Sequence, residues 1–76
     1  MELRNLITFI HVAELGSFTK AAEQLGYSQS TVSFQIKQLE EELGCLLFER
    51  INHTITLTGR GHDLISYAHQ VRALID

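Results

Sequence analysis

The sequence has 76 residues, of which 45% are hydrophobic and 20% charged, with a formal net charge of -3. This length suits one small domain near the lower limit for a single core, and the composition does not indicate disorder. No apolar run approaches the roughly 20 residues that cross a bilayer, and the first residues lack the form of a secretory signal. We therefore expect a globular domain that works in the cytoplasm.

The negative charge counts against nucleic-acid binding at first sight, because domains that bind DNA are usually basic. The acids are concentrated, however, and Glu40, Glu41 and Glu42 together equal the whole net charge. Between residues 28 and 39 the only formal charge is that of Lys37. We expect the acidic triple to be a solvated face turned away from DNA, so the charge distribution leaves nucleic acid open as a partner.

A helix is predicted over residues 28–43, and the rest of the chain is organised around it. Ser28 can cap its start and Gly44 can end it in a left-handed conformation. Its apolar positions recur with a helical period at Val32, Ile36, Leu39 and Leu43. The other face bears hydroxyl and amide side chains, which suit phosphates and base edges. This segment is therefore the candidate DNA recognition helix.

Two shorter helices are predicted before it, from Leu3 to Leu15 and from Phe18 to Leu25. The first is apolar over more than half of its circumference, whereas one core needs an arc of a little over 100°. The excess predicts that this helix packs against a partner chain as well as its own core. The Phe18–Leu25 helix, the glycine turn at Gly26 and the helix over residues 28–43 together form the helix-turn-helix pattern. A plain αα-hairpin without a nucleic-acid role is the open alternative.

The periodicity changes after Gly44. Residues 55–58 alternate apolar and hydroxyl side chains and favour a strand. With the residues before Asn52-His53 they predict a two-stranded hairpin, a wing that could place Arg50 and His53 over the DNA backbone. Thr58 is a plausible cap for a last helix that runs from about Arg60 to the chain end. Its apolar arc has heptad-like spacing, so we expect it to form a dimer.

Many residues in fixed order carry a resemblance to a known family. They include Leu6–Phe9, Gly16–Ala22, Leu25, Ser28–Ser30, Val32, Ser33, Gln35, Ile36, Leu39, Glu40, Leu43, Gly44, Leu47, Phe48, Arg50, Leu57, Thr58 and Gly61. The chain resembles the N-terminal DNA-binding domain of the LysR-type transcriptional regulators of bacteria. The resemblance implies a mainly α fold, with a winged helix-turn-helix of three helices and a two-stranded wing over residues 1–58. A long linker helix that dimerises follows from residue 59, and the chain looks like a fragment cut within this helix.

The resemblance also implies the function and its residues. The partner would be an interrupted inverted repeat in double-stranded DNA, read by the two recognition helices of a homodimer, and no enzymatic activity is expected. Carried over by position, Gln29, Ser30, Ser33 and Gln35, with Thr31 and Lys37 beside them, would face the major groove. Arg50 and His53 would lie at the wing, and Thr19 and Thr58 near phosphates. We also expect Ser28 and Phe34 to be DNA-binding residues. The expected dimer contacts of the first and last helices are Leu3, Leu6, Phe9, Leu64, Tyr67, Ala68, Val71, Leu74 and Ile75. The full-length protein could form a tetramer and contact RNA polymerase, and its effector domain would bind a small-molecule co-inducer.

Several positions leave alternatives open. Phe34 stands where the family commonly has a basic or polar residue, and it could touch a thymine methyl group or pack against the wing. His53 replaces the usual wing arginine, and Arg60 replaces a frequent alanine. Cys45 is expected to be a small core residue rather than a redox-sensing thiol. The histidines lack metal-ligand spacing, so we expect no metal, and this fragment should need no cofactor. A winged-helix module for protein interaction without DNA is the alternative function.

Overall fold

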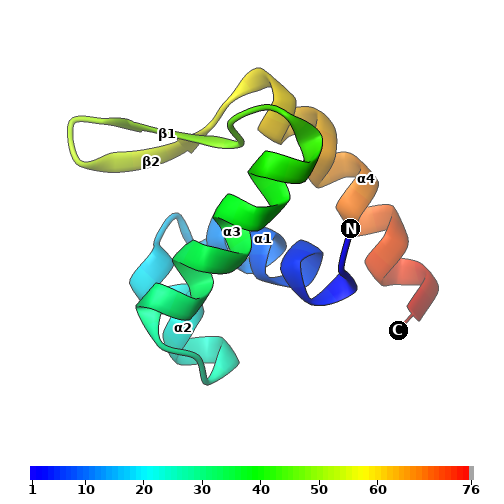
Figure 1. Ribbon diagram of the computed structural model, residues 1–76, viewed down its shortest axis with the longest axis horizontal. Helices are drawn as coiled ribbons and strands as arrows, with labels where there is room; N and C mark the ends of the chain where they lie inside the picture. Colours follow the sequence, from blue (N-terminus) through cyan, green and yellow to red (C-terminus); the bar gives the residue numbers. More distant parts are fainter. Residues whose placement is uncertain (76) are drawn as a thin grey trace.

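The structure, a computed structural model, describes residues 1–75 of the chain. Its elements are α1 (Leu3–Leu15), α2 (Phe18–Leu25), α3 (Gln29–Leu43), β1 (Phe48–Ile51), β2 (Thr54–Leu57) and α4 (Gly59–Ile75). The first three helices pack together, the β-hairpin projects to one side, and α4 runs along the other (Figure 1). This is the predicted order of elements, and α4 begins one residue before the expected start.

Serine caps and glycine turns set the bounds of the helices. The hydroxyl of Ser17 accepts a hydrogen bond from the Lys20 N–H at 3.1 Å, and that of Ser28 accepts one from the Thr31 N–H at 3.2 Å. Each bond satisfies a backbone donor that has no partner inside the helix. Gly26 ends α2 with φ at 75°, a left-handed conformation that glycine adopts without strain. The chain can therefore turn sharply from α2 into α3.

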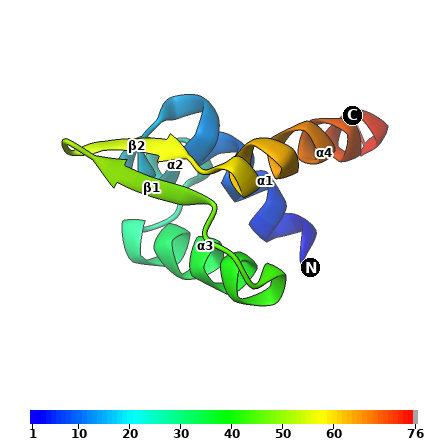
Figure 2. The same ribbon diagram turned by 90° about the horizontal axis from the view of Figure 1, so that it is seen from above.

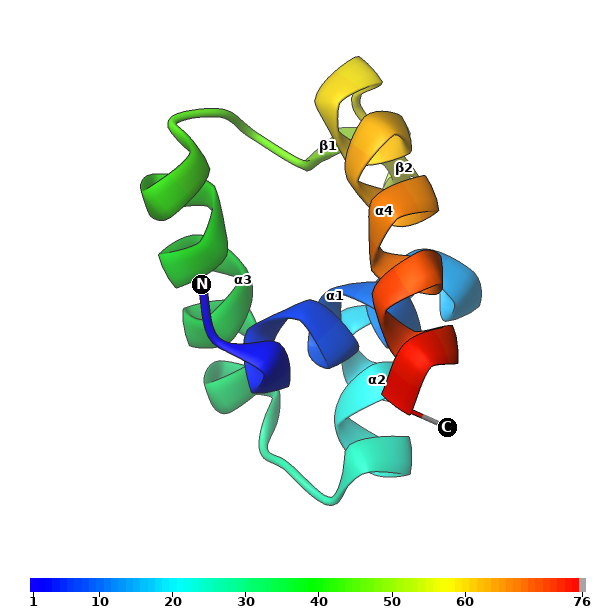
Figure 3. The same ribbon diagram turned by 90° about the vertical axis from the view of Figure 1, so that its right-hand side faces the viewer.

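The core is built around α1, which packs against α2, α3 and α4 and lies between the last two (Figure 3). The buried apolar residues are Leu6, Phe9, Ile10, Val12, Ala21, Ala22, Val32, Ile36, Leu39, Leu47 and Ala68. The assignment of Leu6, Phe9 and Ala68 to a dimer contact is therefore wrong, since they are only 4%, 0% and 0% exposed. The wide apolar arc of α1 is covered by three helices of its own chain.

The wing is a regular antiparallel hairpin with a firm base and an exposed tip. Phe48 lies opposite Leu57, and the turn residues Asn52 and His53 both have positive φ, at 52° and 65°, as a type I′ hairpin turn requires. The Phe48 ring lies 5.4 Å from that of Phe9 and 5.8 Å from that of Phe18, measured between centroids. These contacts hold the hairpin to α1 and α2 while its tip extends beyond the helices (Figure 2).

Candidate nucleic-acid interface

The outer face of α3 carries most of the predicted DNA-binding residues. Successive helical residues are separated by about 100°, so Ser30, Phe34 and Lys37 lie on consecutive turns, opposite the buried Val32 and Ile36. The exposed predicted residues of this helix and its cap are Ser28, Gln29, Ser30, Thr31, Ser33, Phe34 and Lys37. The structure thus brings seven predicted residues to one accessible surface, which we call the outer face.

The first turn of α3 is suited to an anion. Its first-turn residues include no acid, so no carboxylate opposes the positive end of the helix dipole. The Ser28 hydroxyl lies 3.1 Å from the Ser30 hydroxyl and 2.9 Å from that of Thr31, which holds these side chains together. Backbone N–H groups and hydroxyls at a helix N-terminus are a common setting for phosphate contacts.

Gln35 does not lie on the outer face, and its predicted major-groove contact is wrong. Its side chain is 6% exposed and accepts a hydrogen bond of 2.6 Å from the buried hydroxyl of Thr8. Gln35 follows Val32 by three positions and precedes Leu39 by four, which places it on the inner face of the helix. Its amide therefore joins α3 to α1.

A second amide of α3 makes a similar contact. Gln38 accepts a hydrogen bond of 3.1 Å from the side-chain amide of Asn5, which is 2% exposed. Sequence reasoning missed both pairs. The available signal was the presence of two polar residues, Asn5 and Thr8, three positions apart in a helix that is otherwise mainly apolar.

A groove of about 690 Å³ separates α3 from the wing. Its apolar lining includes Phe18, Ile36, Phe48 and Ile55, and its charged lining residues are Lys37, Glu40, Glu41, Glu49 and Arg50. Side chains alternate along a strand, so Arg50 lies on the same face of β1 as Phe48. The cations Lys37 and Arg50 therefore border one groove from its two sides, and His53 is exposed at the turn of the wing.

Phe34 is separate from this groove. Within residues 1–75, it belongs neither to the groove lining nor to the hydrophobic cluster of the core, and its side chain is 64% exposed. The alternative that Phe34 packs against the wing is therefore wrong. The ring stands in solvent between Ser30 and Lys37.

Thr58 has a structural role that competes with its predicted phosphate contact. Its hydroxyl donates to the Leu46 carbonyl at 2.6 Å and accepts from the Gly61 N–H at 3.0 Å, which caps α4 as expected. The single hydroxyl hydrogen is used inside the chain, so none is left to donate to a phosphate. Thr19 on α2, by contrast, is exposed.

The acidic triple is not simply a solvated face. Glu40 is half-buried and accepts a hydrogen bond of 2.8 Å from the Leu47 N–H, while a Glu42 carboxylate oxygen lies 3.1 Å from the amino group of Met1. Only Glu41 continues the line of Phe34 and Lys37 on the outer face. Two of the three carboxylates are therefore engaged within the fold.

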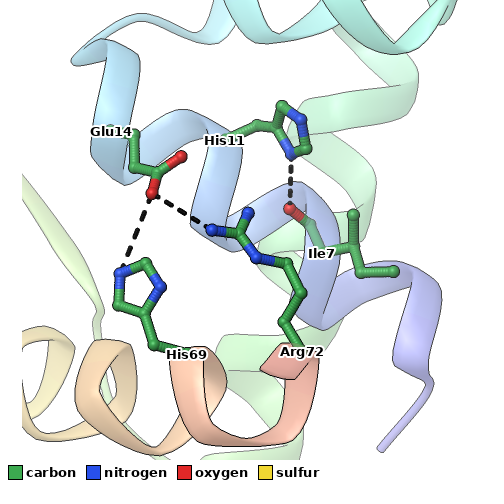
Figure 4. A network of polar contacts seen from close by, with 5 residues as sticks. All are labelled: Ile7, His11, Glu14, His69 and Arg72. Atoms are coloured by element: carbon green, nitrogen blue, oxygen red, sulfur yellow. Dashed lines mark hydrogen bonds and ion pairs between the residues drawn. The ribbon is translucent and has the colours of Figure 1, made fainter. Parts of the chain in front are cut away.

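Exposed polar contacts link α4 to α1. One oxygen of Glu14 lies 3.5 Å from the Arg72 guanidinium and 3.8 Å from the His69 ring, and His11 contacts the Ile7 carbonyl beside it (Figure 4). Among the predicted dimer contacts, Leu64 and Val71 are half-buried against the core. The exposed ones are Leu3, Tyr67, Leu74 and Ile75, at 45%, 54%, 89% and 56%.

Other classes of site find little support in the described part of the chain. Residues 1–75 contain no group of three or more side chains that could hold a metal ion. No helix in the same range is both long and apolar enough to cross a membrane. Cys45 is half-buried and packs against the core, in agreement with its expected role.

A short helix, a glycine turn, a second helix with an accessible face and an adjoining β-hairpin define a winged helix-turn-helix protein. A family model for the bacterial regulatory helix-turn-helix proteins of the lysR family matches residues 3–62. The chain therefore belongs to the LysR family and is a DNA-binding domain of that family.

Relatives and solved structures agree with this assignment. The HTH-type regulator YwqM of Bacillus subtilis (strain 168) is 50% identical over 76 residues, which are all of this chain and 26% of the relative. IlvY of Escherichia coli (strain K12) is 49% identical over 70 residues, 92% of this chain and 24% of IlvY. The BenM DBD in complex with catB site 1 DNA aligns with a TM-score of 0.95 at 45% identity, covering 100% of this chain and 84% of that one. The CbnR DBD in its DNA complex aligns at 0.92 and 40%, covering 99% and 86%. The chain spans about a quarter of the length of the curated relatives. The predicted fold class is confirmed by the structural matches.

Proposed function

We propose that this chain binds an operator in duplex DNA, with the N-terminal half of α3 in the major groove and the wing along the phosphate backbone. The observation that carries the proposal is the accessible outer face, which has no acid between Ser28 and Lys37, beside a groove bordered by Lys37 and Arg50. An α-helix fits the major groove, where base edges present donors and acceptors. The BenM and CbnR domains, which share this fold, are found in complex with DNA, which supports DNA as the partner.

The outer face divides by chemistry into two groups of contacts. Amide, hydroxyl and aromatic side chains can contact base edges, and we assign this role to Gln29, Ser30, Ser33 and Phe34. Cations, short hydroxyls and the helix terminus suit phosphates. We assign backbone contacts to Thr19, Ser28, Thr31, Lys37, Arg50 and His53.

We also propose that the chain acts as a homodimer through α4 on an inverted repeat. Tyr67 and Leu74 are seven positions apart and exposed, so they form one line along the helix, with Ile75 and Leu3 as further apolar surface. In the full-length protein this domain would regulate transcription in the bacterial cytoplasm and carry no catalytic activity. A tetramer, a contact with RNA polymerase and a co-inducer bound by a further domain are proposals for that longer protein.

The test is selection of bound sites from random duplex DNA, followed by titration of a selected duplex across salt concentrations. If Lys37 and Arg50 of each protomer contact phosphates, four neutralised phosphates give a slope of log K against log salt of about −3.6. Arg50→Ala should reduce the magnitude of this slope by about 1.8 and leave the selected sequence unchanged.

Arg72→Ala is the matched control for lost charge. Its guanidinium contacts Glu14 on the α1–α4 side, so the salt slope should be unchanged. No enrichment of any sequence and no binding at low salt would overturn the proposal and favour a protein-interaction role. If Arg50→Ala and the unmodified chain give the same salt slope, Arg50 does not contact phosphates and the wing is not part of the DNA interface.

A further inference from the structure

The position of Phe34 on the outer face calls for a chemical explanation. Single exposed apolar side chains are common and carry no meaning alone. Phe34, however, lies between Ser30 and Lys37 on consecutive turns of α3, so a ligand that contacts this face along its length must meet the ring. The ring makes none of the aromatic contacts found within residues 1–75, and both of those pairs involve Phe48.

The chemistry of the major groove restricts what such a ring can contact favourably. Phenylalanine has no hydrogen-bond donor or acceptor, so it gains nothing from a phosphate oxygen or from the polar edges of guanine, cytosine and adenine. The C5-methyl group of thymine is the apolar group that the major groove presents. Burying it against the ring removes apolar surface of both partners from water, which is favourable.

We infer that Phe34 is a specificity-determining residue, whose ring contacts the methyl group of one thymine in each half of the operator. The inference rests on the proposed DNA binding and extends it to one residue and one base. Ser30 and Lys37, one turn to either side, can hold the backbone and base edges around that thymine. The selection at this position would then be for an A·T pair in one orientation, because only one strand places its methyl group under the ring.

The test uses deoxyuridine, which differs from thymidine only by the missing methyl group. Duplexes recovered by selection are resynthesised with one thymine at a time replaced, and dissociation constants are measured by fluorescence anisotropy at fixed salt. Replacing one particular thymine of a half-site should weaken binding by about fourfold, because burial of one methyl group contributes a binding free energy of that size. Replacement of thymines elsewhere should change binding less.

Variants connect this effect to the ring. Phe34→Ala should bind the thymine and deoxyuridine duplexes equally, whereas Phe34→Leu should keep part of the difference. Leu43→Ala is the matched control, because Leu43 is also on α3 and 40% exposed but lies on the inner side of the helix. Leu43→Ala should keep the full fourfold difference in affinity between the thymine and deoxyuridine duplexes. Circular dichroism of each variant checks that the fold is intact.

The outcomes separate the inference from the function on which it rests. Selection of a defined sequence with no thymine sensitive to replacement would overturn the role of Phe34 and leave DNA binding standing. A fourfold loss that persists in Phe34→Ala would do the same, because the methyl group would then be read by another residue. Failure to enrich any sequence would overturn the proposed function and this inference together.

Discussion

Two adjacent residues of α3, Phe34 and Gln35, project about 100° apart around the helix axis, and each has the polarity expected of the other. The phenylalanine is 64% exposed, whereas the amide is 6% exposed and bonded to Thr8. A helix that only had to fold would place the ring in the core and the amide in water. The arrangement indicates that the two faces serve different requirements, contact with a ligand outside and orientation of the helix inside.

The inner face explains how the outer face is held in position. Apolar packing is largely non-directional, so Val32, Ile36 and Leu39 alone leave some freedom of rotation about the helix axis. Hydrogen bonds need defined distances and angles. The bonds from Thr8 to Gln35 and from Asn5 to Gln38 fix the rotation of α3 relative to α1. The direction in which Phe34 projects is thereby set by residues of another helix.

Among changes at Phe34, Gln35 and the partner of Gln35, the largest expected effect on stability comes from Gln35 on the inner face. Gln35→Ala removes packed side-chain atoms and leaves the buried hydroxyl of Thr8 without its acceptor, which should lower the free energy of unfolding by about 2–3 kcal/mol. Urea denaturation followed by circular dichroism measures the change. Gln29→Ala removes the same side chain from the exposed first turn and should cost less than about 0.5 kcal/mol. Equal losses in the two variants would contradict the distinction between the faces.

A smaller effect is expected from the other partner of this bond. Thr8→Val keeps the shape of the side chain and removes only the hydroxyl, leaving the Gln35 carbonyl oxygen unpaired at a cost of about 1–2 kcal/mol. When Gln35→Leu is added, both polar partners are gone and the double variant should be nearly as stable as the original chain. Denaturation of the four proteins gives the coupling between the sites. Strictly additive losses would show that the bond contributes no coupling.

The bounds of the helices were predictable from the sequence, because the signals that set them are local. Ser17, Ser28 and Thr58 cap helices, and Gly26 ends α2, each through contacts with residues a few positions away. The hairpin turn at Asn52-His53 is equally local. Local interactions of this kind can be predicted from the sequence before any tertiary contact is known.

The errors concern contacts between distant parts of the chain. An amide on a helix surface suggests exposure, and nothing near Gln35 in sequence indicates that Thr8, 27 positions away, provides its donor. In the same way, periodicity shows that α1 is broadly apolar but not whether its own chain or a partner covers it. The sequence predicts a partner contact for Leu6 and Phe9 because the packing of three helices around α1 cannot be inferred from helical spacing.

The smallest expected effect on stability is at the exposed member of the pair. The Phe34 ring buries little surface within the fold, so Phe34→Ser should change the free energy of unfolding by less than about 0.5 kcal/mol. The same urea series used for Gln35→Ala measures it, and Phe9→Ala, which empties a fully buried position, provides the opposite extreme. A loss above 1 kcal/mol for Phe34→Ser would mean that the ring packs within the domain. If the free energy of unfolding is unchanged, Phe34 does not contribute to folding, and its role is at the outer surface of α3.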